Sequence, residues 1–165
     1  MKKALSTCHS THERLMAEGY EPEQAVKVRT KICVSENGKR YQLTTNNTEE
    51  SVVYAVDGVI VRDGQRCDKL VLVKRSAIAV TPERWTESFV ELKGQDVNHA
   101  ADQLRQTLRK DIFKHPSNDD IRARIVAQSF PSSKSDPSME KAKIEFLKDY
   151  NCDLRGMKNG QEDKL

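Results

Sequence analysis

The chain has 165 residues, of which 32% are charged and only 5% are aromatic, and its formal charge is +3. This length suits one domain, the small excess of basic residues is not that of a protein that coats nucleic acid, and the few aromatic rings disfavour a platform for stacking bases. No apolar stretch approaches the roughly twenty residues that a membrane-spanning helix needs, so membrane spanning is excluded.

Two helices and a hairpin are predicted in the first fifty residues. Residues 10–19 end in a glycine, which is typical of a helix stop, and residues 21–31 restart with Pro22, which the first turn of a helix tolerates. Residues 31–47 carry Asn37-Gly38 between two runs that contain Ile, Val, Tyr and Leu, and this pattern predicts a β-hairpin.

The opening residues, MKKALSTC, carry two lysines but no apolar segment behind them. A secretory signal needs that segment, so we expect a cytoplasmic protein. The four cysteines are scattered without a C-x-x-C pair, which disfavours a zinc site, a disulfide framework and a dithiol redox site. We expect four reduced and mostly buried thiols.

Three strands are predicted next, over residues 51–61, 67–75 and 85–94. They are rich in β-branched residues and are separated by turn residues. The period then changes, because the apolar residues of 96–110 recur at helical spacing behind Asp96, a suitable cap, and predict an amphipathic helix.

The end of the chain alternates again. Residues 121–130 read as a strand, 139–150 as a helix and 152–157 as a last short strand, whereas the polar tail from residue 158 is expected to fray. The whole order predicts an α/β domain, an α+β arrangement with a mixed sheet that helices cover. We expect one domain over 1–165, with N-terminal helices and a hairpin over 1–50, a core over 51–130, and a C-terminal helix and tail over 131–165.

The third strand contains the run Val90-Glu91-Leu92-Lys93, in which an acid and a base share one face. Asp68 opens the preceding strand, and a turn between neighbouring strands would bring its carboxylate to that of Glu91. Two carboxylates so close repel each other unless a cation lies between them. Magnesium suits such a place, and the Leu92 carbonyl could add a neutral oxygen. Lys93 would then orient or deprotonate a metal-bound water and offset charge on a phosphodiester.

Asp68, followed after a hairpin by Glu91-Leu92-Lys93 and then by a helix, resembles the PD-(D/E)XK nuclease superfamily, which has the restriction-endonuclease-like fold. The resemblance covers roughly residues 52–130. It implies an αβββαβ core, so that 51–130 is the nuclease-like core, with the acid on the second strand and E-x-K on the third. It also implies that Gln103, on the border of the apolar stripe of the following helix, faces the active site as in RecB-like members.

Some features depart from the pattern of this superfamily. Cys67 stands before Asp68 where many members have a proline. The glutamate of the initial helix is not placed; Glu49 and Glu50 are candidates, and Asp57 is a carboxylate on the preceding strand. Cys67 also invites a thiol-nucleophile reading, but no His or Asn is arranged to support it.

Each site residue also has a structural interpretation. Glu91 and Lys93 could be an exposed pair that blunts an edge strand, Asp68 a turn carboxylate, and Gln103 a solvent-facing helix residue. Basic residues on the helix and on the later strand, Arg122 and Arg124 among them, could contact phosphates or form an ordinary solvated face.

The hypothesis from the sequence is hydrolysis of phosphodiester bonds in nucleic acid, with DNA as the expected substrate and Mg²⁺ or Mn²⁺ as the cofactor. Asp68, Glu91, Lys93 and Gln103 are the predicted catalytic residues, and Asp68, Glu91 and the Leu92 carbonyl are the predicted metal ligands. A homodimer would place two sites on a duplex. The alternatives are a domain of the same fold that has lost catalysis and serves as a binding module, and a protein-interaction domain in which E-x-K is coincidental.

Overall fold

The computed structural model describes residues 7–46, 48–75, 83–92, 96–132 and 134–165. Within these ranges the chain forms helices and strands in the following order: α2 (Thr11–Ala17), β1 (Gln24–Val28), β2 (Lys31–Glu36), β3 (Lys39–Thr44), β4 (Glu50–Ala55), β5 (Lys69–Lys74), β6 (Trp85–Glu91), α3 (Val97–Leu108), the 3₁₀ turn η1 (Asp111–Phe113), β7 (Asn118–Ala127), α4 (Ser138–Tyr150), β8 (Cys152–Lys158) and β9 (Glu162–Lys164). The expectation of a mixed α/β domain is confirmed.

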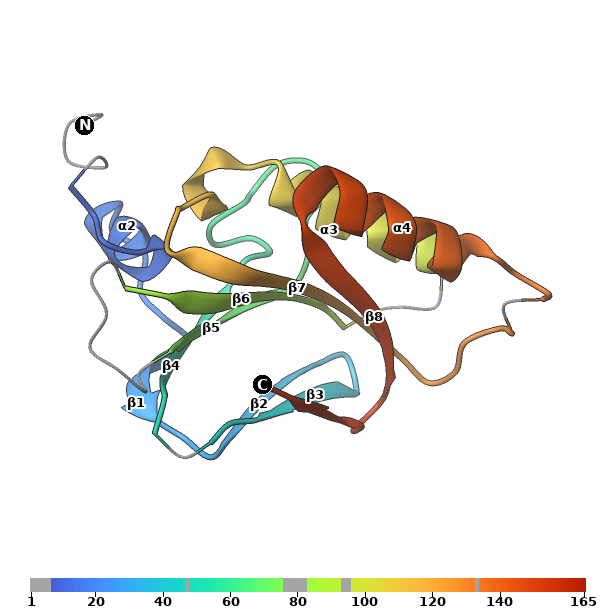
Figure 1. The fold of residues 1–165 in the computed structure, drawn as a ribbon, viewed down its shortest axis with the longest axis horizontal. Helices are drawn as coiled ribbons and strands as arrows, with labels where there is room; N and C mark the ends of the chain where they lie inside the picture. Colours follow the sequence, from blue (N-terminus) through green and yellow to red (C-terminus); the bar gives the residue numbers. More distant parts are fainter. Residues whose placement is uncertain (1–6, 47, 76–82, 93–95, 133) are drawn as a thin grey trace.

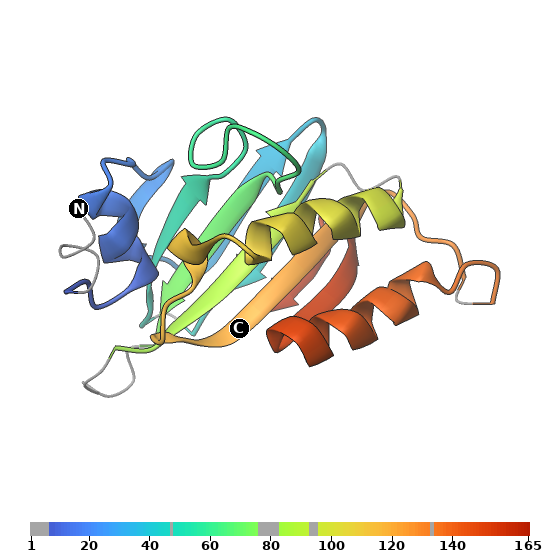
Figure 2. The ribbon, with the colours of Figure 1, turned by 90° about the horizontal axis from the view of Figure 1, so that it is seen from above.

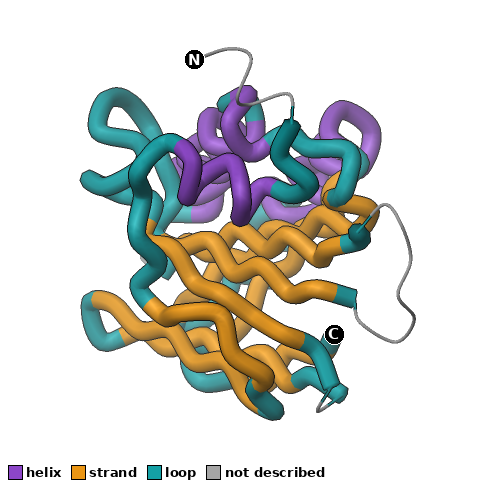
Figure 3. The backbone as a smooth tube through the Cα atoms, turned by 90° about the vertical axis from the view of Figure 1, so that its left-hand side faces the viewer, coloured by secondary structure: helices purple, strands orange, loops and turns teal. Residues whose placement is uncertain are grey.

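The elements stack in three layers. A six-stranded sheet in the order β1-β4-β5-β6-β7-β8 lies between the helices and a small sheet in the order β2-β3-β9 (Figure 1). The α-helices lie on one side of the strands (Figure 3), and α3 and α4 run next to each other across the large sheet (Figure 2). An ion pair between Arg105 and Glu145, 2.5 Å from Nε to Oε1, joins these two helices.

The large sheet is mixed. Strands β1, β4, β5 and β6 pair antiparallel, whereas β6, β7 and β8 pair parallel. A parallel neighbour needs a long crossover, and α3 and α4 supply the two crossovers between these strands. Because β4, β5 and β6 alternate in direction, the ends of β4 and β6 and the start of β5 lie at the same end of the sheet.

Strand β5 reads as a continuous apolar run because both of its faces are covered. Leu70 and Leu72 pack into the core beneath the helices, whereas Val71 and Val73 pack into the core between the two sheets. Strand β6 follows the same alternation, with Phe89 toward the helices and Val90 toward the small sheet. Each covered face thus has its own hydrophobic core.

The local signals at the helix and hairpin ends are confirmed. The Asp96 carboxylate accepts hydrogen bonds from the backbone N–H groups of Asn98 and His99 and caps α3. In the hairpin of β2 and β3, Glu36 pairs with Lys39, which leaves Asn37 and Gly38 as a two-residue turn. Their φ angles of 52° and 73° are left-handed, as such tight hairpin turns require.

Replacing Gly38 by alanine tests this turn. No atom of the described residues lies within 4 Å of where the new Cβ would stand, so the cost comes from the backbone conformation. We expect the free energy of unfolding to fall by about 1 kcal/mol, measured by urea denaturation. Ser35→Ala, at an exposed position of the neighbouring strand, is the control. A loss for Gly38→Ala no larger than that of the control would contradict the assignment.

The prediction of a second helix over residues 21–31 is wrong, because Gln24–Val28 forms the edge strand β1. The free backbone groups of β4 explain the difference, since Glu23 donates its N–H to the Val53 carbonyl at 2.7 Å and the pairing continues to Val28 and Glu50. Strand β4 is also shorter than predicted. It ends at Ala55, before a turn that includes Gly58 with φ of 74°.

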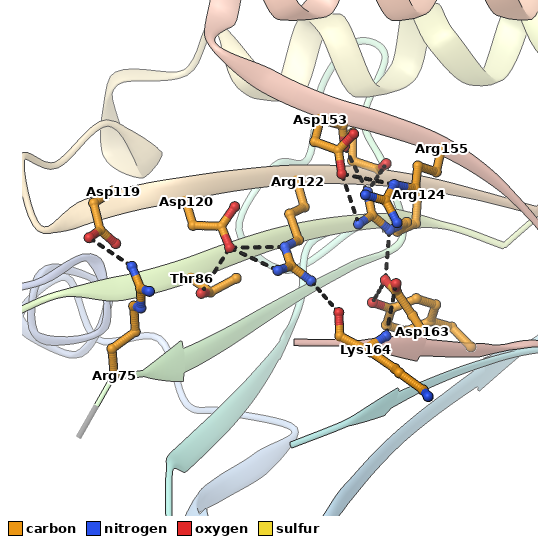
Figure 4. A network of polar contacts seen from close by, with 12 residues as sticks. Arg75, Thr86, Asp119, Asp120, Arg122, Arg124, Asp153, Arg155, Asp163 and Lys164 are labelled. Atoms are coloured by element: carbon orange, nitrogen blue, oxygen red, sulfur yellow. Dashed lines mark hydrogen bonds and ion pairs between the residues drawn. The ribbon is translucent and has the colours of Figure 1, made fainter. Parts of the chain in front are cut away.

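The prediction that the tail frays is also wrong. Residues Glu162–Lys164 form β9, which pairs parallel with β3. Asp163 is buried there beside Arg124, whose side chain is fully buried, so Arg124 is not part of a solvated face (Figure 4). Arg122 is half-buried and contacts Asp120. Within the described ranges, no helix is both long and apolar enough to cross a membrane.

Candidate functional site

Asp68 and Glu91 come together at one end of the antiparallel pair β5 and β6. Lys69 pairs with Val90, so Asp68, just before Lys69, and Glu91, just after Val90, lie at the same end of this strand pair. Glu91 is two residues from Phe89, which packs into the core beneath the helices together with Cys67. The charges of both carboxyl groups act on the Cys67 thiol, so the two groups lie near one another around it.

The end of β6 is tied to Asp68 by hydrogen bonds. The Asp68 N–H donates to the Val90 carbonyl at 3.1 Å, and the Leu92 N–H donates to Asp68 Oδ2 at 2.7 Å. The Asp68 carbonyl accepts a hydrogen bond from Val56, just after β4. Asp68 thus fixes the chain where three strands meet, and the Leu92 carbonyl, the predicted third oxygen, belongs to the residue that it holds.

Helix α3 rests on the segment that leads into β5. Thr107 Oγ1 accepts a hydrogen bond from the Cys67 N–H at 2.9 Å, and the Gln103 amide donates to the Arg66 carbonyl at 3.1 Å. Gln103, predicted to face the site, lies half-buried over the residue two positions before Asp68.

A polar hollow of about 350 Å³ opens beside Gln103, lined also by Asp57, Arg66 and the two residues that precede Arg66. Arg66 Nε and Asp57 Oδ1 form an ion pair at 2.5 Å across it. Asp57, the carboxylate noted on the preceding strand, follows the end of β4 and so lies at this end of the sheet, unlike the two candidates for the missing glutamate. Glu49 and Glu50 stand at the start of β4, the opposite end of that strand.

The carboxyl pair is buried. Asp68 is 1% exposed and Glu91 is 0% exposed, and neither lines the hollow beside Gln103. Burial raises the pKa of the Cys67 thiol, and the charges of Glu91 and Asp68 raise it further. The thiol therefore lies within electrostatic reach of both carboxyl groups and is kept protonated, which speaks against a thiolate nucleophile.

The possible metal ligands at this end of the sheet suit a hard cation. It offers two carboxyl groups and a backbone carbonyl, the oxygen ligands that Mg²⁺ prefers. Among the described residues, no group of three or more His, Cys, Asp or Glu side chains is arranged to hold a metal ion. Lys93, the predicted base, lies outside the described residues. The remaining ligands would be water and substrate oxygens.

Some notable residues escaped the sequence analysis. The ion pair of Asp57 and Arg66 spans nine residues across a loop, and no periodic pattern marks it. Glu87 lies on the same face of β6 as Glu91 but is 2% exposed and faces a separate cavity. Glu87, Phe89 and Glu91 stand two residues apart along one strand, and this spacing predicts that their side chains share one face.

Comparisons with protein-family models, with curated proteins and with solved structures found no match to this chain.

Proposed function

We propose that this protein hydrolyses phosphodiester bonds of nucleic acid, DNA being the expected substrate, with the help of Mg²⁺ or Mn²⁺. The observation that carries the proposal is that Asp68 and Glu91 lie at the same end of the paired central strands β5 and β6, both near the Cys67 thiol. Two acids paired across neighbouring strands repel each other when both are ionised, and a divalent cation between them removes that repulsion. Such a cation activates water and polarises a phosphoryl oxygen.

The order of elements supports membership of the PD-(D/E)XK superfamily. The meander β4-β5-β6 is followed by α3 and by β7, which pairs parallel with β6. This is the βββαβ part of the αβββαβ order that the resemblance implies, with Asp68 just before the second core strand and Glu91 at the end of the third. Helix α2 precedes this unit, with β1, β2 and β3 between them. The coincidence of order and position favours the nuclease over a chance E-x-K.

The residues divide the work as follows in this proposal. Asp68 and Glu91 hold the cation, and the Leu92 carbonyl adds an oxygen. Gln103, fixed by its hydrogen bond to Arg66, borders the polar hollow beside the segment that leads to Asp68. Lys93 keeps the role that the sequence predicts, which is to position water and to offset negative charge.

A second candidate function is a binding module of the same fold without catalysis. The burial of both carboxyl groups favours it, because a metal-bound water must reach the scissile phosphate. In that case the two carboxyl groups would be structural, and nucleic acid or a protein would bind elsewhere.

A cleavage assay tests the proposed function. Labelled single-stranded and duplex DNA and RNA are incubated with the protein in Mg²⁺, in Mn²⁺ and in EDTA. We expect cleavage in at least one metal and none in EDTA, since the cation supplies both the water and the charge stabilisation. The absence of cleavage of every substrate in both metals would overturn the proposal.

Metal binding separates the two candidates further. Titration calorimetry with Mn²⁺ is expected to show one site per chain that Asp68→Asn weakens by roughly a factor of ten or more. An inactive module whose acids are structural would show no carboxylate-dependent heat. Binding that is equal in the wild-type protein and in this variant would also place the ion elsewhere.

A further inference from the structure

A second cavity, of about 690 Å³, lies between the large sheet and the ends of α3 and α4. Glu87 on β6 and Asn118 on β7 belong to its lining, together with the segment after η1 and the last residues of α4. Glu87 stands four residues before Glu91, about 13 Å along the strand. Its volume falls in the range of about 300–1,000 Å³ that is usual for small-ligand sites.

Polar groups sit at the base of this cavity. The Asn118 amide nitrogen, which has two hydrogens to donate, lies within hydrogen-bond distance of three acceptors: Glu87 Oε2, Thr11 Oγ1 at 2.8 Å and the Phe113 carbonyl at 3.1 Å. Asn118 Oδ1 is buried and has no hydrogen-bond partner among the described residues. A buried acceptor without a partner is costly, so a ligand that donates to it gains the full hydrogen bond.

Glu87 adds a carboxyl group beside this acceptor. The residue is 2% exposed, and burial raises the pKa of its carboxyl group well above the ordinary value, against the opposing charge of Arg14. Glu87 and Asn118 thus offer an occupant a carboxyl group and an amide group from neighbouring strands, which suit a planar edge that carries both a donor and an acceptor.

The wall of the cavity is aromatic and its rim is charged, in contrast to its polar bottom. Phe89 and Phe113, whose rings meet edge to face with centroids 5.4 Å apart, form an aromatic wall with Tyr150. Lys114 and Lys148 stand on the exposed rim. Asp149 also lines the cavity, Lys114 forms an ion pair with Asp111 at 3.6 Å, and Arg109 donates to the Tyr150 hydroxyl at 2.9 Å.

From these features we propose that the cavity binds a nucleotide, with the base on Glu87 and Asn118 and the phosphate on the lysine rim. A heterocyclic nucleobase supplies a planar ring for the aromatic wall. Its edge supplies a donor and an acceptor for Glu87 and Asn118 at the bottom of the cavity. A cationic ligand is disfavoured by Lys114 and Lys148. The site goes beyond the proposed hydrolysis and uses none of the residues assigned to it.

Titration calorimetry of the full chain tests this proposal with AMP, GMP, CMP and UMP. We expect at least one to bind with a Kd of roughly 1 mM or tighter, and ribose 5-phosphate to bind at least tenfold more weakly because it lacks the base. A folded wild-type protein that binds none of the four at about 10 mM would overturn the proposal. Equal binding of ribose 5-phosphate would overturn it as well, because the base would then contribute nothing.

Two variants locate the binding. Lys148→Glu on the rim is expected to weaken the nucleotide about fivefold or more, whereas Lys141→Glu, exposed on the same helix and outside the cavity, leaves it unchanged. Ile121→Trp fills the cavity and is expected to abolish binding, with circular dichroism as the check of folding. Nucleotide binding that survives both Lys148→Glu and Ile121→Trp in folded protein would place the site elsewhere.

The nucleotide can come free or as part of a strand. Competition between the bound nucleotide and a short single-stranded oligonucleotide distinguishes the sources. Displacement of the nucleotide by the oligonucleotide in the wild-type protein assigns a strand nucleotide, and the lack of displacement assigns a free one. Neither result depends on cleavage, so the failure of this site and the failure of the hydrolase are separate outcomes.

Discussion

Replacing Asp163 by alanine is expected to lower the free energy of unfolding by about 3–5 kcal/mol, the usual cost of removing one partner of a buried ion pair. Its partner Arg124 is 0% exposed, and the 2.7 Å contact between Arg124 Nε and Asp163 Oδ2 compensates the buried charge. The same oxygen accepts a hydrogen bond from the Tyr41 hydroxyl at 2.7 Å. Without Asp163, a buried guanidinium and a buried phenol both lose an acceptor.

The position of these three residues explains why the loss would reach beyond one contact. Tyr41 lies on β3, Asp163 on β9 and Arg124 on β7, so the network joins the small sheet to the large one (Figure 4). Arg124 also donates to the Asp153 carbonyl at 2.7 Å, and Asp153 belongs to β8. We therefore expect the alanine variant to loosen β9 first, measured as faster hydrogen exchange of its backbone amides.

The loss should depend on pH. Burial raises the pKa of Asp163, but the hydrogen bond from Tyr41 and the charge of Arg124 outweigh it and hold the pKa below the ordinary value. A carboxyl group with a lowered folded pKa stabilises the protein above its unfolded pKa of about 3.9, and this contribution disappears as the pH falls through the folded pKa. The difference between wild type and variant should thus be full at neutral pH and shrink below about pH 4.

Glu162→Ala is the matched control, because Glu162 is the exposed neighbour on the same strand. Urea denaturation at pH 7 is the measurement. An Asp163→Ala variant that loses no more stability than Glu162→Ala would contradict the role of the network.

The sequence predicted the elements whose signals are local. The Asn37-Gly38 turn, the Asp96 cap and the buried strands are set by residues that are neighbours along the chain, so propensity and period suffice. Residues 21–31 mislead because glutamate, glutamine and alanine favour a helix locally, whereas the free edge of β4 decides their conformation.

The tail and the buried Arg124 were predicted wrongly for a different reason. Arg122 and Arg124 alternate with apolar residues on β7, which is the pattern of a strand with one solvated face. That face is covered by the small sheet, whose strands come from both ends of the chain. No local pattern indicates a covering strand 39 residues away, and the three residues of β9 are all charged.

The candidate site could be predicted in part from the sequence. Asp68 and Glu91 belong to consecutive antiparallel strands, so the register of one pairing decides whether they meet, and the sequence predicts both strands. The depth of their burial was not predictable, since it depends on α3 and on the loops packed over the edge. The nucleotide cavity depends on five separate segments and left no motif.

The second large effect concerns catalysis. Asp68→Asn is expected to lower the metal-dependent cleavage rate about 10³-fold, in line with losses seen when one charge-stabilising group is removed from an active site. The free energy of unfolding should change by less than about 1 kcal/mol, because the asparagine carbonyl can still accept the hydrogen bond from Leu92. Single-turnover cleavage and urea denaturation of the same preparations measure the two quantities.

Glu91→Gln and the double variant complete the test. If the two acids share one ion, removing either charge already loses it, so the double variant should be no slower than the slower single variant. Asp63→Asn, which removes an exposed charge from the loop before β5, should leave cleavage and stability unchanged.

The pair of measurements separates a catalytic pair from a structural one. A structural Asp68 would be expected to lose stability in proportion to any loss of cleavage, and an unfolded fraction would then account for the slower rate. A catalytic Asp68 loses the rate in a folded protein. Full cleavage by folded Asp68→Asn protein would contradict the metal assignment, and a 10³-fold loss matched by global unfolding would reassign the carboxyl pair to the fold.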